Sequence, residues 1–252
     1  MKRSVYLQGV GAGLTHIGRV RRANEDSMLL LHQPEDQCVL AVVADGMGGH
    51  RGGAIASSLA TRQLQAAWDT WWQDNRTMPD VDWLFENVQI TDMVLRERAE
   101  EDASLCDMGT TVVAILLKLP ELLVVYIGDS RAYRYHARDF TRLTHDHTVV
   151  QRLVDQGELT LAEAEKSPMR HYLTRSLGGG DTISQPEARM LKVEKGDRIL
   201  LCSDGLTGML SDSDIAAVLA VMPDDRKAAD LLLDLALSRG ASDNVSLVIC
   251  TA

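Results

Sequence analysis

Aspartate stands at the boundary of an apolar, strand-like run at four places in this sequence. Asp45, Asp129 and Asp204 each follow such a run, and Asp243 comes just before another. Taken singly, an Asp at a strand end is typical of a turn, because its side chain bonds to nearby backbone groups and a following glycine accepts a positive φ. Each of the four therefore has a purely structural interpretation.

Their number favours a second interpretation. Asn24-Glu25-Asp26 opens a further strand-like run, which adds two carboxylates. Several carboxylates at one rim of a layered protein repel one another and raise each other's pKa, and a bound cation relieves that repulsion. Oxygen ligands without cysteine or clustered histidine suit a hard ion, Mg²⁺ or Mn²⁺, better than zinc. The pattern indicates a divalent metal site.

Other kinds of phosphate chemistry are not supported. A thiolate phosphatase requires a cysteine with an arginine six positions later, and none of the four cysteines has one. Three of them, Cys38, Cys202 and Cys250, lie within or at the end of apolar runs, which predicts buried, reduced thiols. The chain also lacks the G-x-x-x-x-G-K-[ST] loop of P-loop nucleotide enzymes.

The composition limits which classes of partner and which cellular location are expected. The 252 residues carry a formal net charge of −10, which disfavours nucleic acid and anionic membranes as partners. The longest uninterrupted apolar run, 215–222, is far shorter than the roughly 20 residues of a membrane-spanning helix. Glycines and Gln8 interrupt what would be the apolar core of a secretion signal. We therefore expect one domain over 1–252 and a cytoplasmic location.

The first half of the chain predicts strands, then two helices, then more strands. β-type runs cover 5–15, 27–31 and 38–44, and near-helical apolar spacing follows from Ile55 and again over 82–101. Further β-type runs occupy 110–117, 122–127 and 131–136. Their connections are too short for parallel crossovers, which predicts antiparallel meanders.

The second half adds an insertion and the last layer. Residues 147–181 are polar, helix-prone over 149–164 and broken by Pro168 and three glycines, which predicts a lid over a sheet edge. Strands are expected over 189–193, 198–202 and 245–251, and helices over 212–220 and 224–237. Because amphipathic helices must cover the outer faces of such sheets, we predict an α+β fold, a sandwich of sheets with helices outside.

Eight motifs in order identify a resemblance. They are GRVRRANEDS (18–27), VADGMGGH (43–50), MGTTVVA (108–114), YIGDSRAY (126–133), LTHDHT (143–148), LTRSLG (173–178), CSDGLTGML (202–210) and ASDNVSLVI (241–249). Together they resemble the metal-dependent protein phosphatase family of the protein phosphatase 2C type, in its bacterial form. The resemblance covers about residues 7–249. One D-G-x-G-G alone would be a weak signal, but eight ordered motifs are specific.

The resemblance implies a four-layer α-β-β-α sandwich with two central, mainly antiparallel sheets and a flap over about 147–181. It implies hydrolysis of phosphoserine and phosphothreonine in proteins, with two tightly bound Mn²⁺ or Mg²⁺ ions and a third, weaker one. Such ions lower the pKa of bound water, so no protein nucleophile is needed. The implied partners are phosphorylated proteins and a cognate Ser/Thr kinase, and the expected state is a monomer.

Roles carry over position by position as implications of the resemblance. Asp45 would bridge the two metals, with the Gly46 carbonyl bound to one of them. Asp204 and Asp243 would ligate the other metal. Asp129, together with Asp204, matches the pair that binds the third metal.

The same resemblance assigns residues that would hold the metal-bound water and a residue that would bind the substrate phosphate. Glu25 and Asp26 would hold metal-bound water. Arg21, five residues before Asp26, matches the arginine that binds the substrate phosphate. Clustered arginines at 19, 21 and 22 are also typical of a solvated face, and only the spacing to Asp26 singles out Arg21.

His50 has two interpretations. Eukaryotic members carry histidine directly after D-G, where Met47 stands here, and His50 comes three positions later as in bacterial relatives. It is either the acid that protonates the leaving group or a structural histidine.

Two alternative functions are weighed beside the leading one. A phosphatase of the related sporulation-type branch would act on one partner-switching regulator, but no sensor domain is attached. A pseudoenzyme would bind phosphoproteins without turnover, but every core ligand position holds a competent carboxylate.

Overall fold

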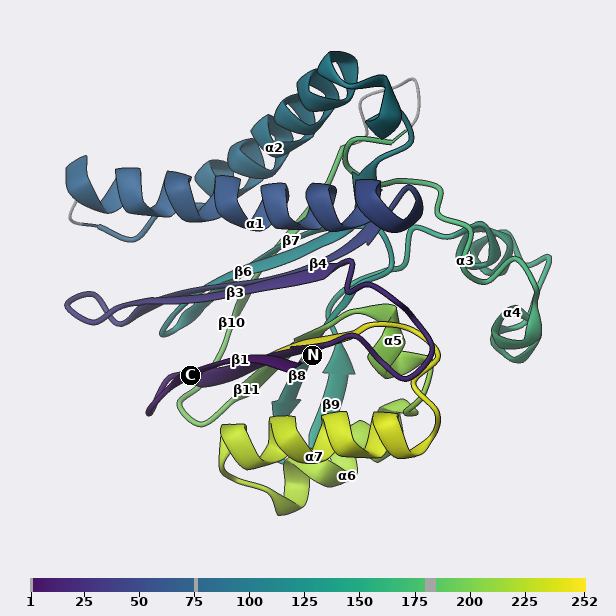
Figure 1. Cartoon of the computed structure of the whole chain (residues 1–252). Helices are drawn as coiled ribbons and strands as arrows, with labels where there is room; N and C mark the ends of the chain where they lie inside the picture. Colours follow the sequence, from purple (N-terminus) through teal and green to yellow (C-terminus); the bar gives the residue numbers. More distant parts are fainter. Residues whose placement is uncertain (1, 75–76, 180–184) are drawn as a thin grey trace.

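Two antiparallel sheets form the centre of the protein (Figure 1). The structure is a computed structural model, and it describes residues 2–74, 77–179 and 185–252, with the side chain of His50 outside the described part. The first sheet has the order β1 (Lys2–Leu7), β2 (Gly11–His16), β12 (Val245–Thr251), β11 (Arg198–Cys202), β8 (Arg131–His136) and β9 (Asp139–Arg142). The second has the order β10 (Glu187–Lys192), β7 (Glu121–Ile127), β6 (Val112–Lys118), β4 (Cys38–Met47) and β3 (Asp26–Gln33), and β5 (Gly109–Thr110) pairs with the end of β4.

Helices cover both outer faces of the sheet pair. The long helices α1 (Gly49–Asp74) and α2 (Val81–Glu101) lie over the second sheet, and α6 (Asp212–Val221) and α7 (Asp225–Ser238) lie over the first (Figure 1). Every strand pairing in the described residues is antiparallel. The predicted four-layer α-β-β-α sandwich is confirmed.

The alternation of apolar side chains along the strands builds the layers. In β4, Leu40 and Val42 face α1 and α2, whereas Val39 and Val43 face the other sheet. This two-residue period is the geometry of a strand, and β4 reads as a continuous apolar run because both of its faces are buried. In the first sheet, Leu247 faces the α6–α7 layer.

Short elements depart from the sequence-based expectations. The run 5–15 is a hairpin of β1 and β2, because Gly9 turns the chain with a φ of +75°. The helix-prone stretch 149–164 is two helices, α3 (Val149–Asp155) and α4 (Leu161–Lys166), separated by Gly157 with a φ of +74°. Three short elements were not expected: β9, the 3₁₀ helix η1 (Ala103–Leu105), and α5 (Asp204–Thr207).

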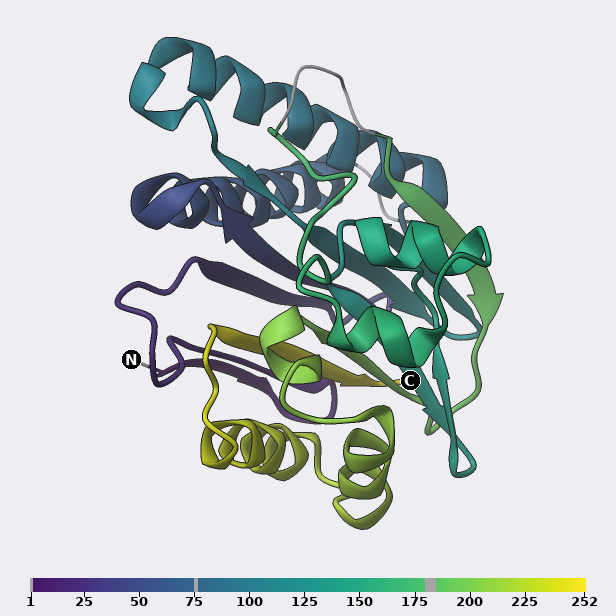
Figure 2. The ribbon, with the colours of Figure 1, turned by 90° about the vertical axis from the view of Figure 1, so that its right-hand side faces the viewer.

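The segment 147–179 forms an excursion at one end of the two sheets. Figure 2 shows α3 and α4 standing in front of that end. The excursion is tied down at its base, because His147 N donates to Gly128 O at 2.9 Å and Thr174 N donates to His147 O at 2.8 Å. The insertion is therefore fixed at its base, while most of its residues are exposed or half-buried. Residues 180 and 181 of its expected range lie outside the described part.

Two smaller expectations can be compared with the structure. Cys38, Cys202 and Cys250 are buried and free, as predicted, while Cys106 is exposed. None of the helices in the described residues is long and apolar enough to cross a membrane.

Arg198 joins the α6–α7 layer to the first sheet at the end far from α5. It is 6% exposed, its Nε donates to Asp225 Oδ1 at 2.8 Å, and its Nη1 donates to the carbonyl oxygens of Leu219 and Met222. Arg198→Ala leaves these acceptors buried without a donor. We expect the free energy of unfolding to fall by about 2–4 kcal/mol.

Urea unfolding measures this loss. The matched control is Arg239→Ala, which removes an exposed pair with Asp214 and should shift the curve little. Equal shifts in the two variants would show that Arg198 is not a structural tie.

Candidate functional site

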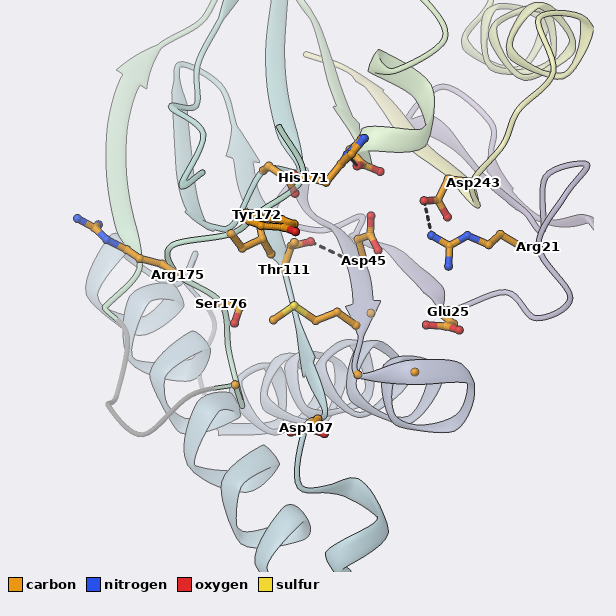
Figure 3. A pocket seen from close by; sticks show the side chains of 18 of the residues that line it. Arg21, Glu25, Asp45, Asp107, Thr111, His171, Tyr172, Arg175, Ser176 and Asp243 are labelled. Carbon is orange, nitrogen blue, oxygen red and sulfur yellow. Dashed lines mark hydrogen bonds and ion pairs between the residues drawn. The ribbon is translucent and has the colours of Figure 1, made fainter. Parts of the chain in front are cut away.

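The rim of the two sheets nearest α3 and α5 surrounds a cavity of about 1140 Å³ (Figure 3). Antiparallel neighbours place the end of one strand beside the start of the next, so residues distant in sequence meet at this rim. Of the residues expected from the sequence, those lining the cavity are Arg21, Glu25, Asp45, Gly46, Asp129, Asp204 and Asp243. Asp26 lies buried beside them and pairs with Asp45 across β3 and β4. The side chain of His50 lies outside the described residues.

Two threonines fix the backbone of Asp45. Thr110 Oγ1 donates to Asp45 O at 2.9 Å, and Asp45 N donates to Thr111 Oγ1 at 3.0 Å. Thr111 Oγ1 also lies 2.7 Å from Ser130 Oγ, next to Asp129. The hydroxyl groups of Thr111 and Ser130 thus connect the backbone of Asp45 to the residue that follows Asp129.

Gly46 allows the start of α1 to approach the rim. A Cβ atom at Gly46 would lie 2.0 Å from Gly53 O and 2.6 Å from Glu25 O, distances that no side chain tolerates. Gly46 N donates to Glu25 O at 3.1 Å. Glycine at this position therefore brings β4, α1 and Glu25 together.

The carboxylates destabilise one another in their ionised form. Burial, followed by the charges of Asp26 and Asp204, raises the pKa of Asp45 well above its ordinary value. Burial and the charges of Asp204 and Asp146 raise the pKa of Asp129 in the same way, against the opposing effect of Arg131. Burial also raises the pKa of Asp26 to about 7, although Ser203 Oγ donates to its Oδ2 at 2.8 Å.

An arginine and a histidine contact two of the acidic residues. Arg21 Nη2 lies 2.7 Å from Asp243 Oδ2, as the dashed line in Figure 3 marks. His171 Nδ1, from the excursion, lies 3.3 Å from Asp204 Oδ2. His171 and Tyr172 lie close to Asp45 in the view of Figure 3, whereas Arg175 extends away from the carboxylates.

The chemistry of the donor set fits a hard cation, and the carboxylates line one cavity without forming a closed cluster of ligands in the described residues. Among the described residues, no group of three or more His, Cys, Asp and Glu side chains is already arranged to hold a metal ion. Asp243 contacts Arg21, and Asp204 contacts His171. The fit rests on chemistry: oxygen donors alone, an excess of negative charge, and raised pKa values that a divalent ion would reverse.

Sequence analysis missed the groups that hold the acidic residues in place. Thr110, Thr111, Ser203 and Asn244 position the site without themselves carrying a charge. A signal was present, because each lies directly beside or within a motif that contains an acidic residue or a glycine turn.

Comparison with known proteins decides the family. The model of the protein phosphatase 2C family matches residues 12–231. The serine/threonine phosphatase Stp of Listeria welshimeri is 32% identical over 235 residues, covering 93% of this chain and 92% of the relative. The chain belongs to the protein phosphatase 2C family.

Solved structures of this phosphatase family share the whole fold. Serine/threonine phosphatase Stp1 from Staphylococcus aureus superposes with a TM-score of 0.89 at 30% identity, covering 100% of this chain and 97% of that one. The catalytic domain of the serine/threonine protein phosphatase PstP, in complex with two manganese ions, superposes with a TM-score of 0.82 at 34% identity, covering 99% and 97% of the two chains.

Asp26 should leave a pH signature in the stability of the metal-free phosphatase. Its pKa is raised from 3.8 to about 7 in the folded protein, so folding takes up a proton between these values. The free energy of unfolding contributed by Asp26 is therefore lost as the pH rises from about 4 to about 7. We expect the metal-free wild type to lose stability over this range more steeply than Asp26→Asn.

Urea unfolding of both proteins at several pH values, after removal of metal by dialysis, measures the difference. Parallel pH curves for wild type and Asp26→Asn would contradict the raised pKa.

Proposed function

We propose that this protein, a serine/threonine protein phosphatase dependent on Mn²⁺ or Mg²⁺, holds two divalent ions with Asp45, Gly46, Asp204 and Asp243. The observation that carries the proposal is the gathering of carboxylates with raised pKa values at one cavity. Burying so many acidic groups together is costly unless cations are bound there. When bound, divalent ions lower the pKa of water and neutralise charge on the phosphoryl oxygens.

Arg21 binds the phosphate of the substrate in this proposal. Burial opposes the charge of Arg21, but the hydrogen bond and charge of Asp243 outweigh it and raise the pKa of the guanidinium. The side chain is 49% exposed at the cavity mouth, so a phosphate can reach it. A guanidinium offers two parallel donors to phosphate oxygens.

Glu25 and Asp26 orient the attacking water. Both lie at the start of β3, where Gly46 N and Ser203 Oγ fix the Glu25 carbonyl and the Asp26 side chain respectively. In the reaction the water oxygen forms a bond to phosphorus while the bond from phosphorus to the seryl or threonyl oxygen breaks. The attacking water gives up a proton and the departing oxygen takes one up, and His50 is either the donor of that proton or a structural histidine.

Asp129 is proposed to bind the third, weaker ion together with Asp204. The charge of Asp204 is the strongest single charge acting to raise the pKa of Asp129, which indicates that the two carboxylates lie near each other. Asp129 precedes β8 in the first sheet, whereas Asp45 ends β4 in the second. The family resemblance assigns Asp129 to the third ion and not to the two tight ions.

Further proposals concern the whole protein. We propose that residues 1–252 form a single catalytic domain with a flap over about 147–181, because one continuous set of four layers includes all the main elements. Phosphoproteins are the substrates, and a Ser/Thr kinase is the proposed antagonist. We also propose a monomer in the cytoplasm, where the buried thiols of Cys38, Cys202 and Cys250 remain reduced.

Substitutions of the acidic residues test the assignment. Asp204→Asn should lower kcat on a phosphothreonine peptide by orders of magnitude, because it removes a charged ligand of a tight ion. Asp129→Ala should reduce turnover but leave two Mn²⁺ ions per chain. Steady-state kinetics and elemental analysis on the same preparations measure both effects.

The matched control is Cys202→Ser, which changes the residue two positions before Asp204 without removing a ligand. It should retain activity where folded. Phosphate release at the wild-type rate without any divalent metal would overturn the proposal, and loss of all bound Mn²⁺ in Asp129→Ala would place Asp129 in the primary site.

A further inference from the structure

The segment that carries Arg21 has no regular secondary structure of its own. It runs from residue 17 to 25 between β2 and β3, and Arg19, Val20, Arg21 and Arg22 on it are exposed. The ion pair with Asp243 can hold the Arg21 guanidinium in place only if the backbone of the segment is also held in place. The position of Arg21 therefore depends on what anchors this segment.

Asn244 anchors both ends of the segment. Its side-chain Nδ2 donates to Ile17 O at 2.8 Å and to Ala23 O at 2.9 Å, and its Oδ1 accepts from Glu25 N at 2.8 Å. The residue is 3% exposed. A primary amide has two N–H donors and one carbonyl, and here all of them bind this one segment.

The neighbours of Asn244 hold the middle of the segment. Asp243 pairs with the Arg21 guanidinium, and Arg19 N donates to Ala241 O at 2.9 Å. Gly18, with a φ of +80°, lies so close that a Cβ atom there would be 2.1 Å from Asp243 O. The end of the loop before β12 thus contacts the segment along its length.

We propose that Asn244 is a positioning residue for phosphate binding: its amide holds the segment 17–25 so that the Arg21 guanidinium is presented to the substrate phosphate. The inference rests on the proposed role of Arg21. Both polar atoms of the Asn244 side chain bond to this segment, and the residue is buried and does not line the cavity, so it acts through Arg21. A carboxylate at this position would lose both donors to the carbonyl oxygens and keep only the acceptor.

A double-mutant cycle separates positioning from a general structural role. Asn244→Ala should raise KM for a phosphothreonine peptide about tenfold with a smaller change in kcat, while the Mn²⁺ affinity measured by calorimetry stays within about threefold of wild type. In an Arg21→Ala background, Asn244→Ala should add little to KM, because the group that it positions is already absent.

Two further variants complete the design. Asn87→Ala removes a comparable amide, which donates to Trp83 O within α2 far from the segment, and should leave KM unchanged. Asn244→Asp keeps the size of the side chain and the acceptor, and should raise KM as Asn244→Ala does. Melting curves establish that each variant folds, and Asn244→Asp provides the test if Asn244→Ala does not.

The outcomes are distinguishable. Additive effects of Asn244→Ala and Arg21→Ala on KM, or a loss of kcat and Mn²⁺ affinity with unchanged KM, would overturn the positioning role. An unchanged KM in Arg21→Ala itself would instead refute the proposed phosphate contact, and with it the premise of the inference.

Discussion

Mutual repulsion among carboxylates gathered at one cavity is the constraint on which this structure depends. Asp26 and Asp45 face each other at the ends of β3 and β4, and Asp129, Asp204 and Asp243 come from strand ends of the other sheet. Burial and neighbouring charges raise the pKa of Asp45 and Asp129 together. Two sheets packed face to face gather these groups, and cations must offset the energetic cost of doing so.

Two nitrogen-bearing side chains contact two of these carboxylates. Arg21 pairs with Asp243, and His171 contacts Asp204. A divalent ion at the proposed site of Asp204 and Asp243 would therefore compete with two groups that themselves line the cavity. This competition links the metal ligands to the arginine proposed to bind phosphate and to the flap that carries His171.

The fold could be predicted from the sequence where short patterns of residues along the chain determine the local structure. Alternating and continuous apolar runs predicted most long strands and helices, and short connections predicted antiparallel pairing, so the aspartates at strand ends could be expected at common rims. Elements as short as β9 and α5 have too few residues for periodicity to show. The split between α3 and α4 depends on the positive φ of Gly157.

The acidic residues of the site were predictable, and their supports were not. Asp45 and Asp204 stand out because charge follows an apolar run. Thr111 bonds to a residue 66 positions away, and Asn244 bonds to residues 219 or more positions away, which no local pattern reveals. Tertiary partners of this kind become visible only once the sheets are packed.

Thermal unfolding with and without Mn²⁺ tests the central claim most directly. At Mn²⁺ concentrations about 100 times the dissociation constant, linkage stabilises the wild type by about 2.7 kcal/mol per site, and the melting temperature rises accordingly. Asp45→Asn should be stabilised much less, and Asp69→Asn, an equal charge change at an exposed position on α1, should respond as the wild type does. Equal Mn²⁺-induced shifts in wild type and Asp45→Asn would contradict the account.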